Sequence, residues 1–276
     1  MKRRQFLKSS AISAAVYPLI SCKSTSLINL KSSTEKTHII SLSFDDGFRK
    51  SFLRVAEIHE NYGTHACLNV IASGHLPSFQ AIDPWILPEL MGDFNDWNML
   101  ISKGHEVMPH TWEHKDLTKV SLPEAKERLD KCFDYFNENL DGYSHDTAVY
   151  NYAFNASTEE LDLYALTKVK AIRTGYWVAL KDDKITNEFP KANYSEPIRL
   201  GCWFHGPDNG DMAIDKGVNE FLASDGGWLI INMHGLDDEG WGPVSTSYYD
   251  GLIKRLIKID NLDLLPVGEV LKKYEV

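Results

Sequence analysis

The sequence predicts one α/β domain, built on a parallel sheet or an α/β barrel, over residues 37–276. Short apolar runs alternate with amphipathic stretches from Thr37 onward, and strands that alternate with helices at this spacing are typical of parallel sheets. The chain has 276 residues, of which 43% are hydrophobic and 25% charged, and this suits one barrel-sized domain with a large core. No repeat, linker or low-complexity segment follows residue 36.

Local patterning predicts each element in turn. The apolar runs predict strands at 38–44, 66–71, 105–108, 148–152, 171–173, 228–233 and 264–267. Apolar faces with helical spacing predict helices at 51–62, 94–103, 122–140 and 248–259. Gly63 and Gly104 end the first two helices, and Pro123 lies in the first turn of the third. Because catalytic groups of such folds gather beyond the carboxyl ends of strands, we expect the site where polar residues follow these runs.

The first 36 residues predict an export signal and a tether. Residues 1–21 combine a basic start, an apolar stretch and small residues before Cys22, which is typical of a secretory signal and too short for a membrane span. The run RRQFLK at 3–8 resembles the twin-arginine export motif, and LISC at 19–22 resembles a lipobox that ends on a lipidated cysteine. We expect a lipid anchor at Cys22, a tether over 22–36, and a location in the cell envelope, in the periplasm or on the cell surface. An ordinary signal peptide with a chance cysteine is the alternative.

Charge and cysteine content exclude two classes of site. Beyond residue 21 the chain has 25 basic and 39 acidic residues, a net charge of −14, so no nucleic-acid partner is expected. Cys67, Cys132 and Cys202 each lie in an apolar segment and have no paired spacing. They predict buried thiols, without a disulfide framework or a thiolate zinc site.

Three groups of polar residues follow predicted strands. Asp45 and Asp46 end the first strand, where one carboxylate can bind a metal while the other acts as a base, although a helix cap would also explain them. His110 and His114 have the spacing that lets two imidazoles hold one ion, with a chance surface pair as the alternative. His234 ends the most apolar strand and suits a general acid, with a core histidine as the alternative. One aspartate with two histidines is a ligand set common at catalytic zinc.

Taken together, these motifs resemble the polysaccharide deacetylase family, also called the NodB homology domain. The matching segments are SFDDG at 43–47, HTWEH at 110–114 and LIINMH at 229–234, in the family's order. The resemblance covers about residues 37–275 and implies a distorted (β/α)7-type barrel with a closing helix at 268–274.

The resemblance also implies roles for these residues. Asp46, His110 and His114 become the ligands of one divalent metal ion, expected to be zinc, with Asp45 as catalytic base and His234 as catalytic acid. The first hypothesis is therefore hydrolysis of an acetyl group from a poly- or oligosaccharide. In it Asp45 takes a proton from the attacking water, and His234 protonates the leaving amine or alcohol.

Two family motifs are changed in this chain. The third usually reads R-x-P-Y/F-G, with an arginine that orients the base, but the matching stretch at 150–155 reads YNYAFN. The fourth, an aspartate beside a tryptophan, has no clear match. Arg173, at a predicted strand end, is the candidate to replace the missing arginine. In a second hypothesis Arg173 and the metal hold a uronate carboxylate, and the enzyme eliminates water as a dehydratase or lyase. A non-catalytic sugar-binding lipoprotein is the third, and the retained base, ligands and acid argue against it.

Further residues near these strand ends are candidates for contact with the saccharide. Aromatic rings stack on the C–H faces of sugars, although rings in loops can also simply cap a barrel. The segments 203–206 and 240–243 are expected to be loops, and residues 237–239 a solvated acidic loop. The candidate substrate-binding residues are Tyr150, Tyr152, Asn155, Trp203, His205 and Trp241.

Overall fold

Parallel strands form the centre of the computed structural model, which describes residues 35–80, 83–180, 184–191 and 198–276. They follow the order β3-β2-β1-β7-β6-β5-β4, with β8 paired to β1 off this path. The strands are β1 His38–Phe44, β2 Cys67–Val70, β3 Glu106–Pro109, β4 Val149–Asn151, β5 Ala171–Gly175, β6 Ile198–Phe204, β7 Gly227–Met233 and β8 Leu262–Leu264.

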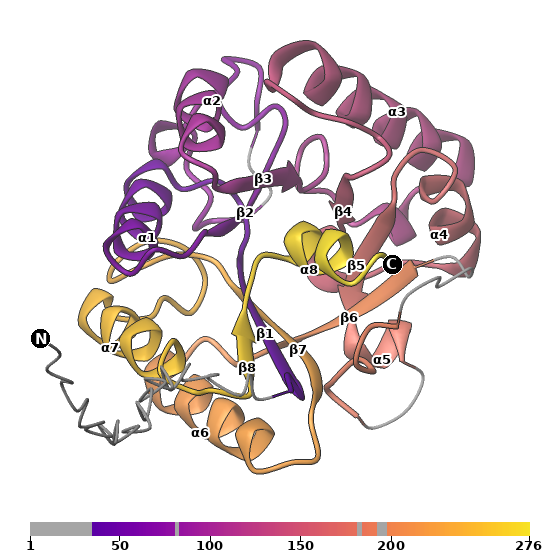
Figure 1. The fold of residues 1–276 in the computed structure, drawn as a ribbon. Helices are drawn as coiled ribbons and strands as arrows, with labels where there is room; N and C mark the ends of the chain where they lie inside the picture. Colours follow the sequence, from indigo (N-terminus) through magenta and orange to yellow (C-terminus); the bar gives the residue numbers. More distant parts are fainter. Residues whose placement is uncertain (1–34, 81–82, 181–183, 192–197) are drawn as a thin grey trace, which may run out of the picture. The chain divides into compact units, whose positions relative to one another are not determined.

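Helices follow the strands along the chain and surround them, as Figure 1 shows. Short 3₁₀ turns lie at Pro88–Leu90, Leu117–Lys119 and Ala153–Asn155. The α-helices are α1 Arg49–Asn61, α2 Phe94–Ser102, α3 Leu122–Asn139, α4 Glu159–Ala165, α5 Tyr176–Ala179, α6 Gly210–Leu222, α7 Thr246–Leu256 and α8 Val267–Lys273.

The two ends of the strand path, β3 and β4, meet through side chains. Asn151 donates its Nδ2 to the carbonyl oxygen of Pro109 at 3.3 Å, and the backbone nitrogen of Val149 lies 3.5 Å from the sulfur of Met108. The seven strands of the path therefore form a nearly closed barrel. This confirms the predicted fold class, a single α/β domain with a distorted (β/α)7-type barrel.

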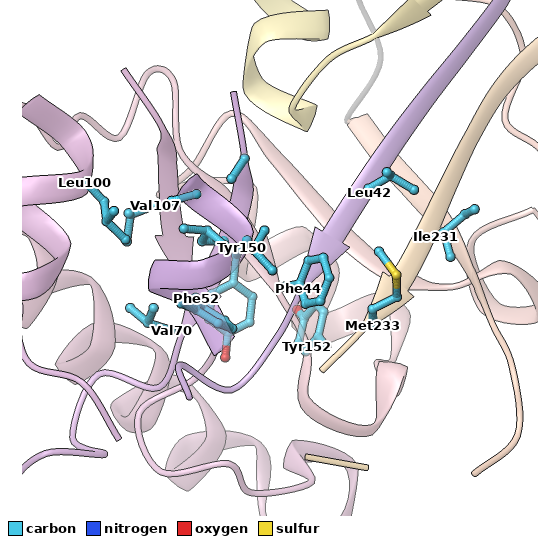
Figure 2. Close-up of a cluster of buried hydrophobic side chains, with 14 of the residues drawn as sticks. Leu42, Phe44, Phe52, Val70, Leu100, Val107, Tyr150, Tyr152, Ile231 and Met233 are labelled. Atoms are coloured by element: carbon cyan, nitrogen blue, oxygen red, sulfur yellow. The ribbon is translucent and has the colours of Figure 1, made fainter. Parts of the chain in front are cut away.

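A hydrophobic core joins the strands to the surrounding helices (Figure 2). Tyr150 and Tyr152 belong to it, each only 1% exposed, and their rings meet edge to face at 4.8 Å. The ring of Tyr150 also packs on Phe133 of α3 at 5.2 Å. Successive side chains of a strand point to opposite faces, so Asn151 points into the barrel and its two tyrosine neighbours point away from it. Contact of Tyr150 and Tyr152 with a saccharide is therefore a wrong expectation.

Most predicted elements are present, with the errors concentrated in the second half of the chain. Strand β6, and helices α4, α5 and α6, were absent from the expectation. The predicted strand at 264–267 is β8, which ends at Leu264, and α8 already begins at Val267. Trp203 and Phe204, expected in a loop, end strand β6.

The predicted signal peptide and Cys22 lie outside the described residues, as does the tether up to residue 34. Within the described part of the chain, no helix is long and apolar enough to cross a membrane.

Candidate active site

The carboxyl edge of the barrel collects the polar residues that follow the strands. Asp45 and Asp46 follow β1, His110 follows β3, and His234 follows β7. Parallel strands place these ends together, so residues almost 190 positions apart come into contact. For example, the side chain of Asn232 lies 187 positions from Asp45 and donates to it.

Asp46, His110 and His114 form a candidate metal site. One potential ligand atom from each residue lies within 4.8 Å of the other two. Nε2 of His110 and Nε2 of His114 lie 3.4 and 3.3 Å from the same oxygen of Asp46. Both oxygens of Asp46 are buried, and neither has a hydrogen-bond donor among the described residues. A buried carboxylate without donors needs a cation, so these three side chains fit a divalent ion.

The other ring nitrogen of each histidine has an acceptor that fixes the imidazole. Nδ1 of His110 lies 3.0 Å from the carbonyl oxygen of Asn151, and Nδ1 of His114 lies 2.7 Å from a carboxylate oxygen of Asp83. Both acceptors favour the proton on Nδ1, which leaves the Nε2 lone pair directed toward Asp46. Metal-ligating histidines are commonly held in this way. Sequence reasoning missed Asp83, because no motif surrounds it.

Charge keeps Asp46 ionised despite its burial. Burial opposes ionisation of the carboxyl, but the electrostatic attraction of His114 and His110, whose Nε2 atoms face the same carboxylate oxygen, outweighs it, so the pKa of Asp46 lies below its usual range. The carboxylate is therefore negative at neutral pH and available as a ligand.

Asp45 is held quite differently from its neighbour. Its Oδ1 accepts a hydrogen bond from Asn69 at 2.8 Å, and its Oδ2 accepts from Arg173 at 2.6 Å and from Asn232 at 2.8 Å. Burial raises the pKa of Asp45, but the charges of Arg173 and of nearby histidines outweigh it, and the pKa lies below its usual value. The protein itself thus fixes Asp45 as an oriented carboxylate.

Two short chains of asparagines support Asp45. Asn151 donates to the side-chain oxygen of Asn69, and Asn155 donates to that of Asn232, each at 2.9 Å. All four asparagines are buried. Sequence reasoning missed the first pair and Asn232, although Asn69 and Asn232 interrupt apolar strands. Such interruptions are the signal that could have identified them.

Arg173 lies behind Asp45, not at the surface of the site. Its side chain is fully buried on β5, beside Asn151 of β4 in the strand register. The guanidinium therefore takes the place beside Asp45 that the sequence analysis expected for it. Arg173 does not line the cavity described below, so the elimination hypothesis has no cation from this residue at the substrate surface.

His234 stands at the edge of the site, partly buried, with its ring perpendicular to Trp241 at 5.6 Å. No hydrogen-bond partner for its Nδ1 is found in the described chain. Burial lowers the pKa of His234, and the nearby Asp46 and Asp45 offset only part of this effect. The imidazole is thus neutral at neutral pH in the free protein.

A cavity of about 280 Å³ opens over these groups. Aromatic side chains from four separate segments form much of its wall, and none of the described residues that line it is a lysine or an arginine. Its lining residues are Asp45, Trp85, His110, His114, Phe154, Asn155, Phe204, Asn232, His234 and Trp241.

The remaining substrate-binding candidates divide between the cavity and its surroundings. Asn155 and Trp241 line the cavity. His205 is buried and stacks against Trp241, with ring centroids 6.4 Å apart. Trp203 faces away and covers Gly217 of α6, where an added Cβ would lie 3.0 Å from its ring. Direct contact of Trp203 with the sugar is a wrong expectation, because strand alternation turns Phe204 into the cavity and Trp203 outward.

The backbone around the cavity is unusually strained. Asp46, Thr111, His114, Phe154 and Asn155 have φ values of 83°, 67°, 54°, 57° and 51°. Side chains rarely adopt this left-handed region, and each such residue costs about 1–3 kcal/mol unless its surroundings enforce it. Such strain concentrates at functional sites, and here it sets the direction of two candidate metal ligands.

Glu239 bonds the loop that carries Trp241 to the first turn of α1. Its Oε2 accepts from the backbone nitrogen of Ser51 at 2.9 Å and from the hydroxyl of Ser51 at 2.5 Å. The N-cap residue of α1, Phe48, supplies no side-chain cap, so Glu239 does this from a distant loop. The expected solvated acidic loop is therefore wrong for Glu239, which is buried.

The barrel and the cluster at its carboxyl edge define a class of protein: a barrel enzyme with a candidate divalent-metal site beside a held carboxylate. The family model for polysaccharide deacetylase matches residues 32–168, and the chain belongs to this family. No curated protein sequence matches the chain.

Three solved structures illustrate the likeness of fold. The Xyl-CE4 domain of a multidomain xylanase from the hindgut metagenome of Trinervitermes trinervoides is 15% identical, with a TM-score of 0.56 over 88% of this chain and 93% of that one. Peptidoglycan deacetylase PdaC from Bacillus subtilis is 19% identical, with a TM-score of 0.52 over 86% and 91%. A family 4 acetyl xylan esterase from Clostridium thermocellum, in complex with a cobalt ion, is 14% identical, with a TM-score of 0.52 over 85% and 91%.

Proposed function

We propose that this protein hydrolyses acetyl groups from a poly- or oligosaccharide with the help of one divalent metal ion. One observation carries the proposal: two adjacent carboxylates at the end of β1 are treated in opposite ways. Asp45 receives three hydrogen bonds from the protein, whereas Asp46 receives none and faces two imidazoles. A fixed base beside a cation site is the arrangement that metal-assisted hydrolysis needs.

Asp46, His110 and His114 would hold the ion, which we propose is zinc because one carboxylate and two imidazoles suit it. When bound, such an ion polarises the acetyl carbonyl and makes water more acidic. Asp45 accepts the proton of the attacking water, and its Oδ1, with only one hydrogen bond, keeps a lone pair free for this. His234 then delivers a proton to the leaving amine or alcohol. Because its imidazole is neutral in the free protein, the proton that Asp45 takes from the water replaces the one that His234 gives, so that acetate and the free sugar are released without a net change in protonation.

The experiment is to incubate the purified, zinc-loaded protein with acetylated and with uronate-containing oligosaccharides and to follow their mass. Loss of about 42 mass units per event shows deacetylation, and loss of about 18 shows elimination of water. Asp45→Asn keeps the size of the side chain and removes the base, so it serves as the matched inactive control. Elimination of water by the wild type, without release of acetate, would contradict the proposal.

We also propose that the protein is exported and anchored by lipid at Cys22 in the cell envelope. The support is the basic start, the twin-arginine-like run and the lipobox-like residues before Cys22. Radiolabelled palmitate should enter the wild type and not Cys22→Ser. Equal labelling of both proteins, or a wild type found only in the cytoplasm, would contradict it.

A further inference from the structure

An aromatic wall leads from the cavity to an exposed tryptophan on α5. Phe204 lines the cavity, and its ring lies 6.1 Å from that of Trp241. On its other side, Phe204 meets the indole of Trp177 at 5.5 Å with the rings steeply inclined. Trp177 is 45% exposed, which is unusual for so large an apolar side chain. The wall is therefore continuous from the candidate active site to the protein surface.

The position of Trp177 is set by two glycines. A Cβ at Gly175 would lie 2.6 Å from the Trp177 ring, so the indole lies directly on the end of β5. A Cβ at Gly201 would lie 2.9 Å from Leu180 and 3.0 Å from Tyr176, so α5 rests directly on β6. Any other residue at either position would displace the helix or the ring. The exposed indole is thus held by the backbone beneath it.

A fixed, half-exposed indole beside a catalytic cavity offers an apolar surface to a sugar ring, whose C–H face can stack on it. The cavity itself, at about 280 Å³, lies at the small end of ligand sites and has room for one sugar rather than a chain. The neighbouring sugars of an oligosaccharide must then lie outside it. Since no described lining residue is a lysine or an arginine, the wall suits neutral rings.

We propose that Trp177 forms a second sugar subsite, which binds a neutral pyranose linked to the one that loses its acetyl group. The proposal rests on the proposed function, because it places the acetylated sugar in the cavity above Asp45. The sugar on Trp177 belongs to the same saccharide chain as the acetylated sugar in the cavity, and the chain passes from one to the other along the ring of Phe204.

The test compares substrate lengths. Wild type, Trp177→Ala and Trp177→Phe are assayed on two pairs of substrates, each a monomer and a tetramer. The first pair is N-acetylglucosamine and its tetramer, and the second is acetylated xylose and acetylated xylotetraose. Ile257→Ala is the matched control, since Ile257 is 40% exposed at the C-terminal end of α7, and helices that follow parallel strands end at the opposite edge of the barrel.

Trp177→Ala should lower the tetramer-to-monomer ratio of kcat/KM about 10-fold, mainly through KM, as expected for loss of one stacking contact. Trp177→Phe should restore most of the ratio, and Ile257→Ala should leave it unchanged. An unchanged ratio in Trp177→Ala overturns the subsite, and so does an equal loss on both lengths, which would indicate only a structural role.

Failure of the subsite can be distinguished from failure of the proposed function. If the wild type deacetylates neither series, the proposed function fails, and calorimetry with unacetylated xylotetraose then decides on the subsite alone. Weaker binding to Trp177→Ala than to wild type and Ile257→Ala supports it, whereas equal binding by all three, or no binding by the wild type, overturns it.

Discussion

Replacement of Arg173 removes the only guanidinium bonded to Asp45 in the described structure. Nη2 of Arg173 lies 2.6 Å from Oδ2 of Asp45, and the side chains are 0% and 2% exposed. Arg173→Met would leave Asp45 buried with two amide donors and no bonded cation. Breaking a buried ion pair by removing one partner costs about 3–5 kcal/mol of stability. Loss of a hydrogen bond to a charged group costs about 1.5–3 kcal/mol, which corresponds to roughly 10- to 150-fold in kcat/KM.

The assay combines unfolding in urea with kcat/KM on a neutral and a uronate-containing acetylated oligosaccharide. Arg173→Met should lose activity equally on both substrates, because Arg173 lies behind Asp45 and does not line the cavity. Arg173→Lys keeps the charge without the planar geometry, so its losses should be smaller. Arg199→Met is the matched control: Nε of Arg199 bonds a buried carboxylate at 3.2 Å near the start of β6, away from the site. It should lose stability while the folded enzyme keeps its activity.

Two results would refute this reasoning. Full activity and unchanged stability of Arg173→Met would make the pair with Asp45 irrelevant. A loss confined to the uronate substrate would mean that Arg173 reaches the sugar, as the elimination hypothesis requires, despite its complete burial.

Other residues give three further predictions. His110→Ala combined with His114→Ala should abolish bound zinc, measured by mass spectrometry, and activity, while circular dichroism shows an intact barrel; full activity of the metal-free variant would contradict the site. Burial raises the pKa of Glu106 from 4.5 to about 7, so the folded state holds a proton on this carboxyl more tightly than the unfolded chain does. The stability that this proton contributes is complete below pH 4.5 and is lost as the pH rises through 7. In urea, the free energy of unfolding of Glu106→Gln should therefore rise relative to that of the wild type by up to about 3 kcal/mol between pH 4.5 and pH 8. A difference between the two proteins that does not change with pH would contradict this linkage. Glu239→Ala should cost about 1–2 kcal/mol of stability by uncapping α1, and should raise KM by loosening the loop of Trp241; Glu239→Gln should lose less, and an unchanged urea midpoint in Glu239→Ala would exclude the cap.

The clustering of the candidate ligands beside Asp45 could be predicted from sequence because the signals of these residues are local. Asp45 and Asp46 directly follow a continuous apolar run, and His110 and His114 share one loop at a fixed spacing. The arginine beside Asp45 could also be predicted, since it ends the expected strand at 171–173 and the family's own arginine is absent, although in the structure it lies at the middle of β5. For these residues, chain position alone determines the edge of the barrel on which they lie.

The supporting residues could not be predicted because their partners are distant in sequence. Asp83 lies in the irregular segment between β2 and α2 and is identified only by its bond to His114, 31 positions away. Phe204 was misplaced because β6 contains an arginine and a glycine that obscure the strand pattern, and the two glycines of α6 obscure the helix that follows. Glu239 could not be separated from its two acidic neighbours, since only the fold shows which carboxylate reaches α1.

The asparagine chains beneath Asp45 have a direction. In each, the amide nitrogen of one asparagine is donated to the oxygen of the next, and the last nitrogen is donated to Asp45. Reversing any one amide would turn an acceptor toward an acceptor, so the whole layer has a single favourable orientation. Its dipoles are set when the barrel folds and need not rearrange when a sugar arrives, which makes the floor of the cavity a preorganised electrostatic template for a negative group. Exchange of Asn69 or Asn232 for aspartate would preserve the shape of this template and reverse its polarity, presenting Asp45 with a like charge in place of a donor.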